Sequence, residues 1–207
     1  MIHYFDMIKD KNITEGGLIM KITNLNGQKT TVILLAILFA LNMMAFFLPL
    51  NPFNTQAILN NAEGVQIPDI MVIYSPNQLY QFLSQIQESG RDAFQGMHLT
   101  IDLSFPIIYS LLFFFIMRWQ LFILGKQKSL LPLVSFLAGG FDLAENFTLF
   151  YITSHFPQFL TNVSTLTQGL TILKFALIIT CISLILILLS KSMIDKKNQK
   201  ADHPSFS

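Results

Sequence analysis

Residues 130–153 read LLPLVSFLAGGFDLAENFTLFYIT, an apolar stretch that carries Asp142, Glu145 and Asn146 near its middle. About 20 predominantly apolar residues are enough to cross the hydrocarbon core of a bilayer as a helix. A charged side chain at the centre of such a helix costs roughly 2.5–3.5 kcal/mol on insertion scales. Other groups in the protein must offset this cost, so these three residues are the strongest indication of a functional site.

The composition of the whole chain is that of a membrane protein. Of its 207 residues, 52% are hydrophobic and only 12% are charged, whereas soluble domains have about 25% charged residues. The mean hydropathy is +0.53. Irregular backbone cannot face lipid, so each apolar run is expected to form a helix. The composition therefore predicts an all-α integral membrane protein in contact with the lipid bilayer.

Three further runs reach spanning length besides residues 130–153. They are residues 31–50, 99–117 and 166–189. Together the four runs predict a four-helix bundle, a multi-pass membrane domain over residues 31–190. Residues 51–98 form the one long connection between these spans.

The cationic residues are distributed very unevenly along the chain. They gather in residues 1–30, in the connection after the second span and in residues 191–207, whereas the other two connections hold only Arg91. Cytoplasmic loops carry an excess of Lys and Arg. We therefore expect both termini in the cytoplasm and the protein in the plasma (inner) membrane. Residues 191–207 are polar without an apolar period, which predicts a disordered basic tail.

The outer connection contains the signals of one amphipathic helix. Ser75 followed by Pro76 is a typical helix start. Four apolar residues then fall on one face at helical spacing: Leu79, Phe82, Leu83 and Ile86. An amphipathic helix lying on the outer membrane surface or capping the bundle fits this pattern. We expect a break at Ser89-Gly90 and a new helix from Arg91, with residues 51–69 forming a loop.

Polar residues form a stripe along the second span and its lead-in. They are Arg91, Gln95, His98, Asp102 and Tyr109, spaced so that they share one helical face. Pro106 lies between the last two and cannot donate a backbone hydrogen bond. It is therefore expected to kink the helix and to free the carbonyl of Asp102.

The third and fourth spans are expected to meet through their polar residues. Asp142, Glu145 and Asn146 share one face, which Ser135, Ala138 and Gly139 extend with small side chains that are typical of close helix contacts. In the fourth span, Lys174 is the single charge, and Thr171 shares its face. At 1.5 Å per residue, Lys174 and Glu145 lie at about the same depth, so Lys174 can pair with Glu145 or with Asp142.

These residues together predict a polar pocket in the outer half of the bundle. The ligand or proton site would consist of Asp102, Asp142, Glu145, Asn146 and Lys174, with Arg91, His98 and Tyr109 at its mouth. The carboxylates outnumber the ammonium, and buried carboxylates without a counter-ion either take up protons or bind a cation. The leading hypothesis is therefore the binding or transport of a small polar or cationic ligand, or of protons.

Two other function classes remain open. His98 and Asp102 could serve an intramembrane enzyme that modifies lipids, or ligate a metal, although two candidate ligands do not specify a metal site. Alternatively, the protein is a scaffold or accessory subunit, as a homo-oligomer or with a partner membrane protein, and the buried polar groups only hold its helices together. In that reading Asn42 bonds a neighbouring helix.

Some classes of protein function are excluded by the sequence, and others have no support in it. The chain has a single cysteine, Cys181, so an internal disulfide and CxxC thiol chemistry are impossible. No segment has the basic and aromatic pattern of a nucleic-acid surface, and no motif identifies a cofactor.

Overall fold

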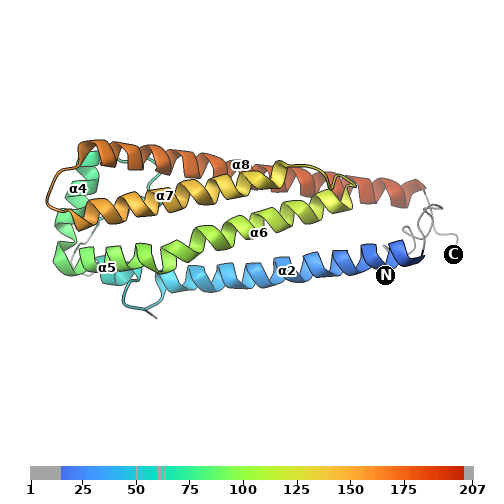
Figure 1. Cartoon of the computed structure of the whole chain (residues 1–207), viewed down its shortest axis with the longest axis horizontal. Helices are drawn as coiled ribbons and strands as arrows, with labels where there is room; N and C mark the ends of the chain where they lie inside the picture. The colour runs from blue at the N-terminus through green and yellow to red at the C-terminus, as the bar shows by residue number, and fades with distance from the viewer. Residues whose placement is uncertain (1–14, 50, 60–61, 63, 203–207) are drawn as a thin grey trace.

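The computed structural model describes residues 15–49, 51–59, 62 and 64–202, and these residues contain helices and no strand. Four long helices run along the molecule, each antiparallel to the long helix before it in the chain (Figure 1). They are α2 (Glu15–Phe47), α6 (Ile101–Ile123), α7 (Val134–Ser154) and α8 (Thr161–Asp202). Shorter helices gather at the end remote from the start of α2: α3 (Thr55–Leu59), η1 (Pro68–Ile70), α4 (Pro76–Gln85) and α5 (Gln87–Leu99). We call these four short helices the cap. The remaining helix, η2 (Leu131–Leu133), leads into α7.

Three helical segments are long and apolar enough to cross a membrane. They are Gly27–Phe47, Gln87–Ile123 and Thr161–Asp195. Their length and composition indicate an integral membrane protein. The helix α7 is not among them, although it has 21 residues, because its acidic and amide side chains lower its mean hydropathy.

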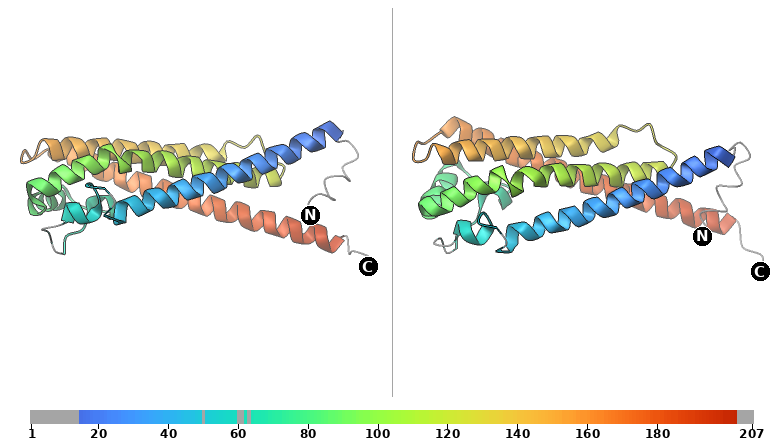
Figure 2. Two further views of the ribbon diagram at one scale, coloured as in Figure 1. Left: turned by 90° about the horizontal axis from the view of Figure 1, so that it is seen from below. Right: turned by 60° about the horizontal axis from the view of Figure 1, so that its bottom comes forward.

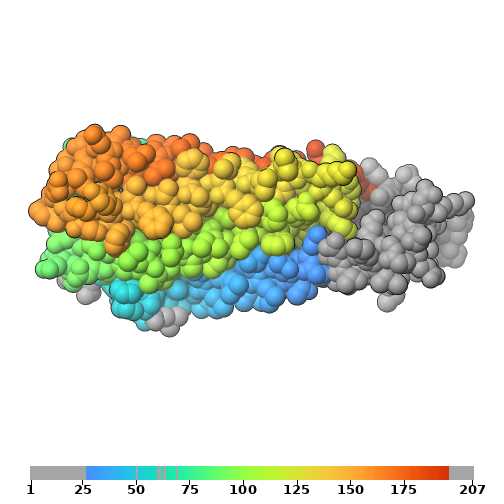
Figure 3. Space-filling view, viewed as in Figure 1, coloured from blue at the N-terminus to red at the C-terminus, as the bar shows by residue number. Residues whose placement is uncertain are grey.

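The long helices form a three-helix core with a fourth helix beside it. The helices α6, α7 and α8 pack against one another, and α2 lies mainly along α6. Figure 3 shows α7, α6 and α2 side by side on one face. Buried Tyr109, Met117, Ala138 and Cys181 form the centre of the core. Figure 2 shows that α2 and α8 diverge with increasing distance from the cap.

The cap has a hydrophobic core of its own that continues into α7. Ser75 and Gln78 form a capping box at the start of α4, with Pro76 in its first turn. The helix buries Leu79 and Leu83. This cap core includes Phe94 of α5 and Ile152 of α7, so the cap is packed onto the end of the long helices.

Two predicted boundaries in the outer connection differ from the structure. The break between α4 and α5 lies at Ile86–Gln87, where Gln87 has a φ of 56°, and not at Ser89-Gly90. Gly90 lies inside α5, and a Cβ there would be 2.7 Å from the carbonyl oxygen of Ile58, so the glycine permits close packing of α5 on α3. Residues 51–69, predicted as loop, contain α3 and the start of η1.

The predicted tail is also different. Residues 191–202 continue α8 as helix, and residues 15–30 belong to α2. Extending an existing helix is much easier than starting one, and the Lys, Met, Gln and Ala of this tail are good helix formers. The rest of the predicted terminal segments, residues 1–14 and 203–207, lies outside the described residues.

Candidate functional site

The centre of the candidate site is an ion cluster between α7 and α8, made of Asp142, Glu145 and Lys174. The Nζ atom of Lys174 lies 2.5 Å from Oε2 of Glu145 and 3.3 Å from Oδ1 of Asp142. All three residues are buried. Asp142 and Glu145 are one helical turn apart, so a single ammonium reaches both. Lys174 therefore pairs with both predicted partners.

Hydroxyl groups bind the remaining carboxylate oxygens of the ion cluster. The Tyr109 hydroxyl donates to Oδ2 of Asp142 over 3.0 Å, and the Thr171 hydroxyl lies 2.5 Å from Oε1 of Glu145. The Tyr74 hydroxyl lies 3.2 Å from Oγ1 of Thr171. Each carboxylate is thus bound by the ammonium and by one hydroxyl, and Tyr74 connects the cap to the cluster.

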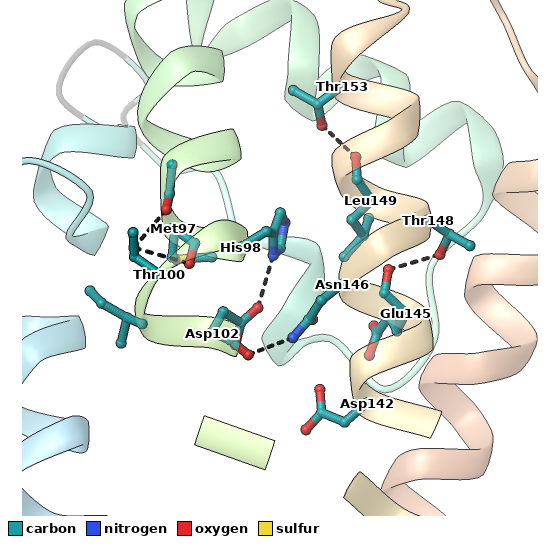
Figure 4. Close-up of polar contacts among 12 residues, drawn as sticks. Met97, His98, Thr100, Asp102, Asp142, Glu145, Asn146, Thr148, Leu149 and Thr153 are labelled. Carbon is teal, nitrogen blue, oxygen red and sulfur yellow. Dashed lines mark hydrogen bonds and ion pairs between the residues drawn. The ribbon is translucent and has the colours of Figure 1, made fainter. Parts of the chain in front are cut away.

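Pro106 creates the second polar feature of the site. Because Pro106 has no backbone N–H, the carbonyl of Asp102, one turn earlier in α6, lacks its usual helical partner. The side-chain Nδ2 of Asn146 donates to this carbonyl over 2.7 Å (Figure 4). The freed carbonyl predicted from the sequence is therefore occupied by a side chain of α7, which ties α6 to α7 inside the protein.

His98 and Asp102 form a pair across the junction of α5 and α6. Nδ1 of His98 lies 2.8 Å from Oδ2 of Asp102. The two residues are four apart, and the junction between their helices is at Thr100 (φ −123°, ψ −88°). The side chain of His98 is fully buried, whereas that of Asp102 is 9% exposed. Of this pair, Asp102 is the member with an accessible edge.

A partly open cavity of about 150 Å³ lies beside these residues. Asp102, Asp142 and Lys174 form its polar part. The other lining residues come from α2, the cap and α6: Met43, Phe46, Phe47, Thr55, Ile67, Ile70, Met97 and Phe105. The cavity therefore has an almost entirely apolar wall and a charged base, and it lies on the side of α6 where α2 packs.

The three residues predicted at the mouth lie elsewhere and do not line this cavity. Arg91 is in the cap, where its guanidinium donates to the carbonyl of Leu83 over 2.9 Å and lies 4.5 Å from the centre of the Phe156 ring. His98 and Tyr109 are buried behind Asp102 and Asp142, to which they bond. The bend at Thr100 interrupts the straight helix on which the predicted stripe depends.

The two other predicted site residues also lie behind the cavity wall. Both are buried; Glu145 pairs with Lys174 in the ion cluster, and Asn146 donates to the carbonyl of Asp102. Of the five predicted ligand or proton site residues, Asp102, Asp142 and Lys174 line the cavity. Glu145 and Asn146 bond to Lys174 and Asp102, respectively, from behind the wall.

The donor set does not form a metal site. Within the described residues, no group of three or more His, Cys, Asp or Glu side chains is placed to hold a metal ion. The two weak candidates, His98 and Asp102, are bonded to each other.

Small residues bring α7 close to α6 at this level. Ser135, Ala138 and Gly139 are buried, and a Cβ on Gly139 would lie 2.9 Å from the carbonyl oxygen of Pro106. On the other side of α6, Nδ2 of Asn42 donates to Oγ of Ser104 over 2.6 Å, as the sequence predicts for a helix contact. These contacts position Asp102 between α2 and α7.

Sequence reasoning missed Tyr74 and the apolar wall of the cavity. Nothing in the local sequence around Tyr74 indicates a contact with α8. Met43, Phe46 and Phe105 are of the same residue types as side chains that face lipid, so no local signal distinguishes them.

Comparisons of the chain with protein-family models, curated proteins and solved structures give no match. The evidence for its function therefore comes from the residues of the site.

Proposed function

We propose that this protein is a four-span membrane protein that binds, and moves across or within the membrane, a proton or a small positively charged ligand. The site is the cavity at Asp102 and Asp142. The observation that carries the proposal is the charge of the buried groups beside it. Three carboxylates, those of Asp102, Asp142 and Glu145, accompany the ammonium of Lys174 and the imidazole of His98.

The formal charge of these groups is negative in either protonation state of His98. Buried charges without a counter-ion cost several kcal/mol each, so ionised carboxylates at this site favour an additional positive charge. A proton supplies it by neutralising one carboxylate, and a cationic ligand supplies it by occupying the cavity.

The packing of α7 supports its role as a membrane span in addition to the three apolar segments. Its 21 residues measure about 31 Å at 1.5 Å per residue, close to the hydrocarbon thickness of a bilayer. Asp142 and Glu145 turn toward Lys174 and the hydroxyls of Tyr109 and Thr171. Their charges are therefore directed away from lipid.

The orientation follows from the charged residues. Lys29, Lys126, Lys128 and Lys191 are exposed and belong to segments at the end remote from the cap. By the positive-inside rule this end is cytoplasmic. The cavity then lies in the outer half of the plasma membrane, and its ligand enters from the outer side or from the outer leaflet.

The scaffold alternative is favoured by one set of contacts. Besides the bond of Asn42, the Ser192 hydroxyl of α8 donates to Oε1 of Gln120 of α6 over 2.9 Å. Such bonds hold helices together without any ligand. The enzyme alternative is weaker, because the His98 side chain is fully buried and cannot reach a substrate in this conformation.

The test compares neutral isosteres of the two acidic residues of α7. Asp142→Asn and Glu145→Gln each remove one negative charge and should lower uptake at least about tenfold, the factor that corresponds to 1.4 kcal/mol. Purified protein in liposomes is assayed for uptake of protons, radiolabelled Na⁺ and radiolabelled n-butylammonium. Asp92→Asn, at an exposed position of α5, is the matched control and should leave uptake unchanged.

Circular dichroism and size-exclusion chromatography establish that each variant is folded. If both folded variants take up all three probes as the unsubstituted protein does, the proposal is wrong. If the unsubstituted protein takes up none of the three, the scaffold alternative is preferred.

A further inference from the structure

We propose that the ligand of the cavity is a small primary alkylammonium ion, with its charged group on Asp102 and its apolar part against the ring and thioether side chains of the wall. This inference rests on the proposed function and specifies its ligand. It makes Asp102, rather than the acidic residues of α7, the group that binds the ligand directly.

The available carboxylate oxygens identify Asp102. Both oxygens of Asp142 are bound, one by Lys174 and one by Tyr109. Glu145 does not line the cavity and is bound by Lys174 and Thr171. Asp102 lines the cavity, is 6% exposed, and uses Oδ2 for His98. Its Oδ1 has no hydrogen-bond donor among the residues that the structure describes, so it is the open acceptor.

A second acceptor lies close to Asp102. Asn146 uses Nδ2 for the backbone carbonyl of Asp102, and its own Oδ1 is buried without a hydrogen-bond partner in the described part of the chain. A primary ammonium has three N–H donors. It can therefore donate to Oδ1 of Asp102, which a quaternary ammonium cannot, whereas Asn146 does not line the cavity.

The wall of the cavity favours an organic ion over a metal ion. Ca²⁺ needs six or more oxygen ligands and Mg²⁺ about six, whereas this wall consists mainly of Met, Phe and Ile side chains. Phe46 and Phe105 pack edge to face with ring centres 5.6 Å apart. Aromatic rings attract ammonium groups, and the rest of the wall suits an alkyl chain.

The volume of the cavity and the charges of its lining further restrict the class of ligand. A cavity of about 150 Å³ holds a molecule of about the size of benzene, which matches a butyl chain with an amine. An anionic head group is disfavoured because Lys174, the cation of the lining, already pairs with two carboxylates.

The experiment measures binding of matched ligands to the full chain in nanodiscs by isothermal titration calorimetry, with empty nanodiscs as the blank. The ligands are n-butylammonium, methylammonium, 1-butanol, butyrate and Na⁺. Each methylene transferred from water contributes about fourfold in affinity. We expect n-butylammonium to bind at least about tenfold more tightly than any of the other four.

The variant arm uses Asp102→Asn with Asp92→Asn as the matched control. Loss of the charged acceptor should weaken n-butylammonium at least about tenfold, and the control should bind as the unsubstituted protein does. The ligand series on the unsubstituted protein tests the inference even if Asp102→Asn does not fold.

Equal affinity for 1-butanol and n-butylammonium would overturn the inference, because the cavity would then select only for apolar bulk. Equal affinity for methylammonium or Na⁺, or an unchanged affinity in folded Asp102→Asn, would also overturn it. Uptake of protons or Na⁺ that depends on Asp142 and Glu145, without n-butylammonium binding, would overturn this inference and leave the proposed function standing. If the protein takes up neither protons nor Na⁺ and does not bind n-butylammonium, both this inference and the proposed function are wrong.

Discussion

At the scale of single residues, the site shows how one missing backbone donor is compensated from another helix. Pro106 deprives the Asp102 carbonyl of its helical partner, and Asn146 supplies the donor. A buried carbonyl without a donor costs about 1–3 kcal/mol. Asn146 therefore supplies the donor that Pro106 lacks and helps to hold Asp102, the open acceptor, at the cavity.

A double-mutant cycle tests this compensation. Asn146→Ala should destabilise the protein by about 1–3 kcal/mol, because it leaves the Asp102 carbonyl without a donor. Pro106→Ala restores a backbone N–H in α6, so Asn146→Ala should cost about 1 kcal/mol less in that background. Unfolding in mixed detergent micelles measures both values.

The control for this cycle is Gln120→Ala, which removes a different interhelical bond, to Ser192. Its cost should be the same with Pro or Ala at position 106. Equal costs of Asn146→Ala in the two backgrounds would show that Asn146 does not compensate for the proline.

At the scale of helices, one face of α7 carries both the close contact with α6 and the acidic residues of the ion cluster. Gly139 lies against α6 near Pro106 and Ser110, where a Cβ would overlap the Ser110 hydroxyl. The neighbouring Gly140 is exposed and has no atom within 4 Å of the position a Cβ would take. Adjacent glycines thus have different roles, and only Gly139 permits the contact that brings α7 to Asp102.

This difference predicts opposite effects of the same substitution. Gly139→Ala should destabilise the protein by about 1–3 kcal/mol through overpacking. Gly140→Ala should stabilise it by up to about 1 kcal/mol, because alanine is the better helix former. Thermal unfolding of the two variants in one detergent compares them directly, and equal effects would mean that α7 does not pack as described.

At the scale of the whole molecule, the lining of the cavity comes from α2, α6, α7, α8 and the cap. The helix α2 lies mainly along α6, and its outer side exposes Leu34, Ile37 and Leu41, as expected for a helix that faces lipid. The charged base of the cavity is thus covered on one side by a helix with few contacts to the rest of the core.

The proposed orientation predicts where introduced cysteines react. Gln158 and Lys128 are exposed in the connections that flank α7, and Cys181 is buried. In a Cys181→Ala background, Gln158→Cys should react with a membrane-impermeant maleimide on intact cells. Lys128→Cys should react only after permeabilisation.

The reactions of the two introduced cysteines, compared on intact cells, decide whether α7 crosses the membrane. Reaction of both cysteines on intact cells, or of neither, would place the two connections on the same side and exclude α7 as a span. Reaction of Lys128→Cys alone would reverse the orientation and place the termini outside.

The sequence by itself determined what is encoded along a single helix. The apolar runs indicate the membrane class. The spacing of Asp142, Glu145 and Asn146 places them on one face, and Pro106 marks the freed carbonyl. These are local properties, because helical periodicity relates residues only a few positions apart. The common depth of Lys174 and Glu145 in the membrane follows from the rise of about 1.5 Å per helical residue, counted from the ends of their spans.

Only the tertiary structure decided which groups meet and which stay open. Tyr74 contacts Thr171 across 97 positions of the chain, and the cavity is lined from α2 to α8. The bend at Thr100 and the partners of Asp142 leave Oδ1 of Asp102 as the open acceptor. Such contacts depend on how separate helices pack, and an apolar side chain that lines a cavity has the same local sequence signal as one that faces lipid.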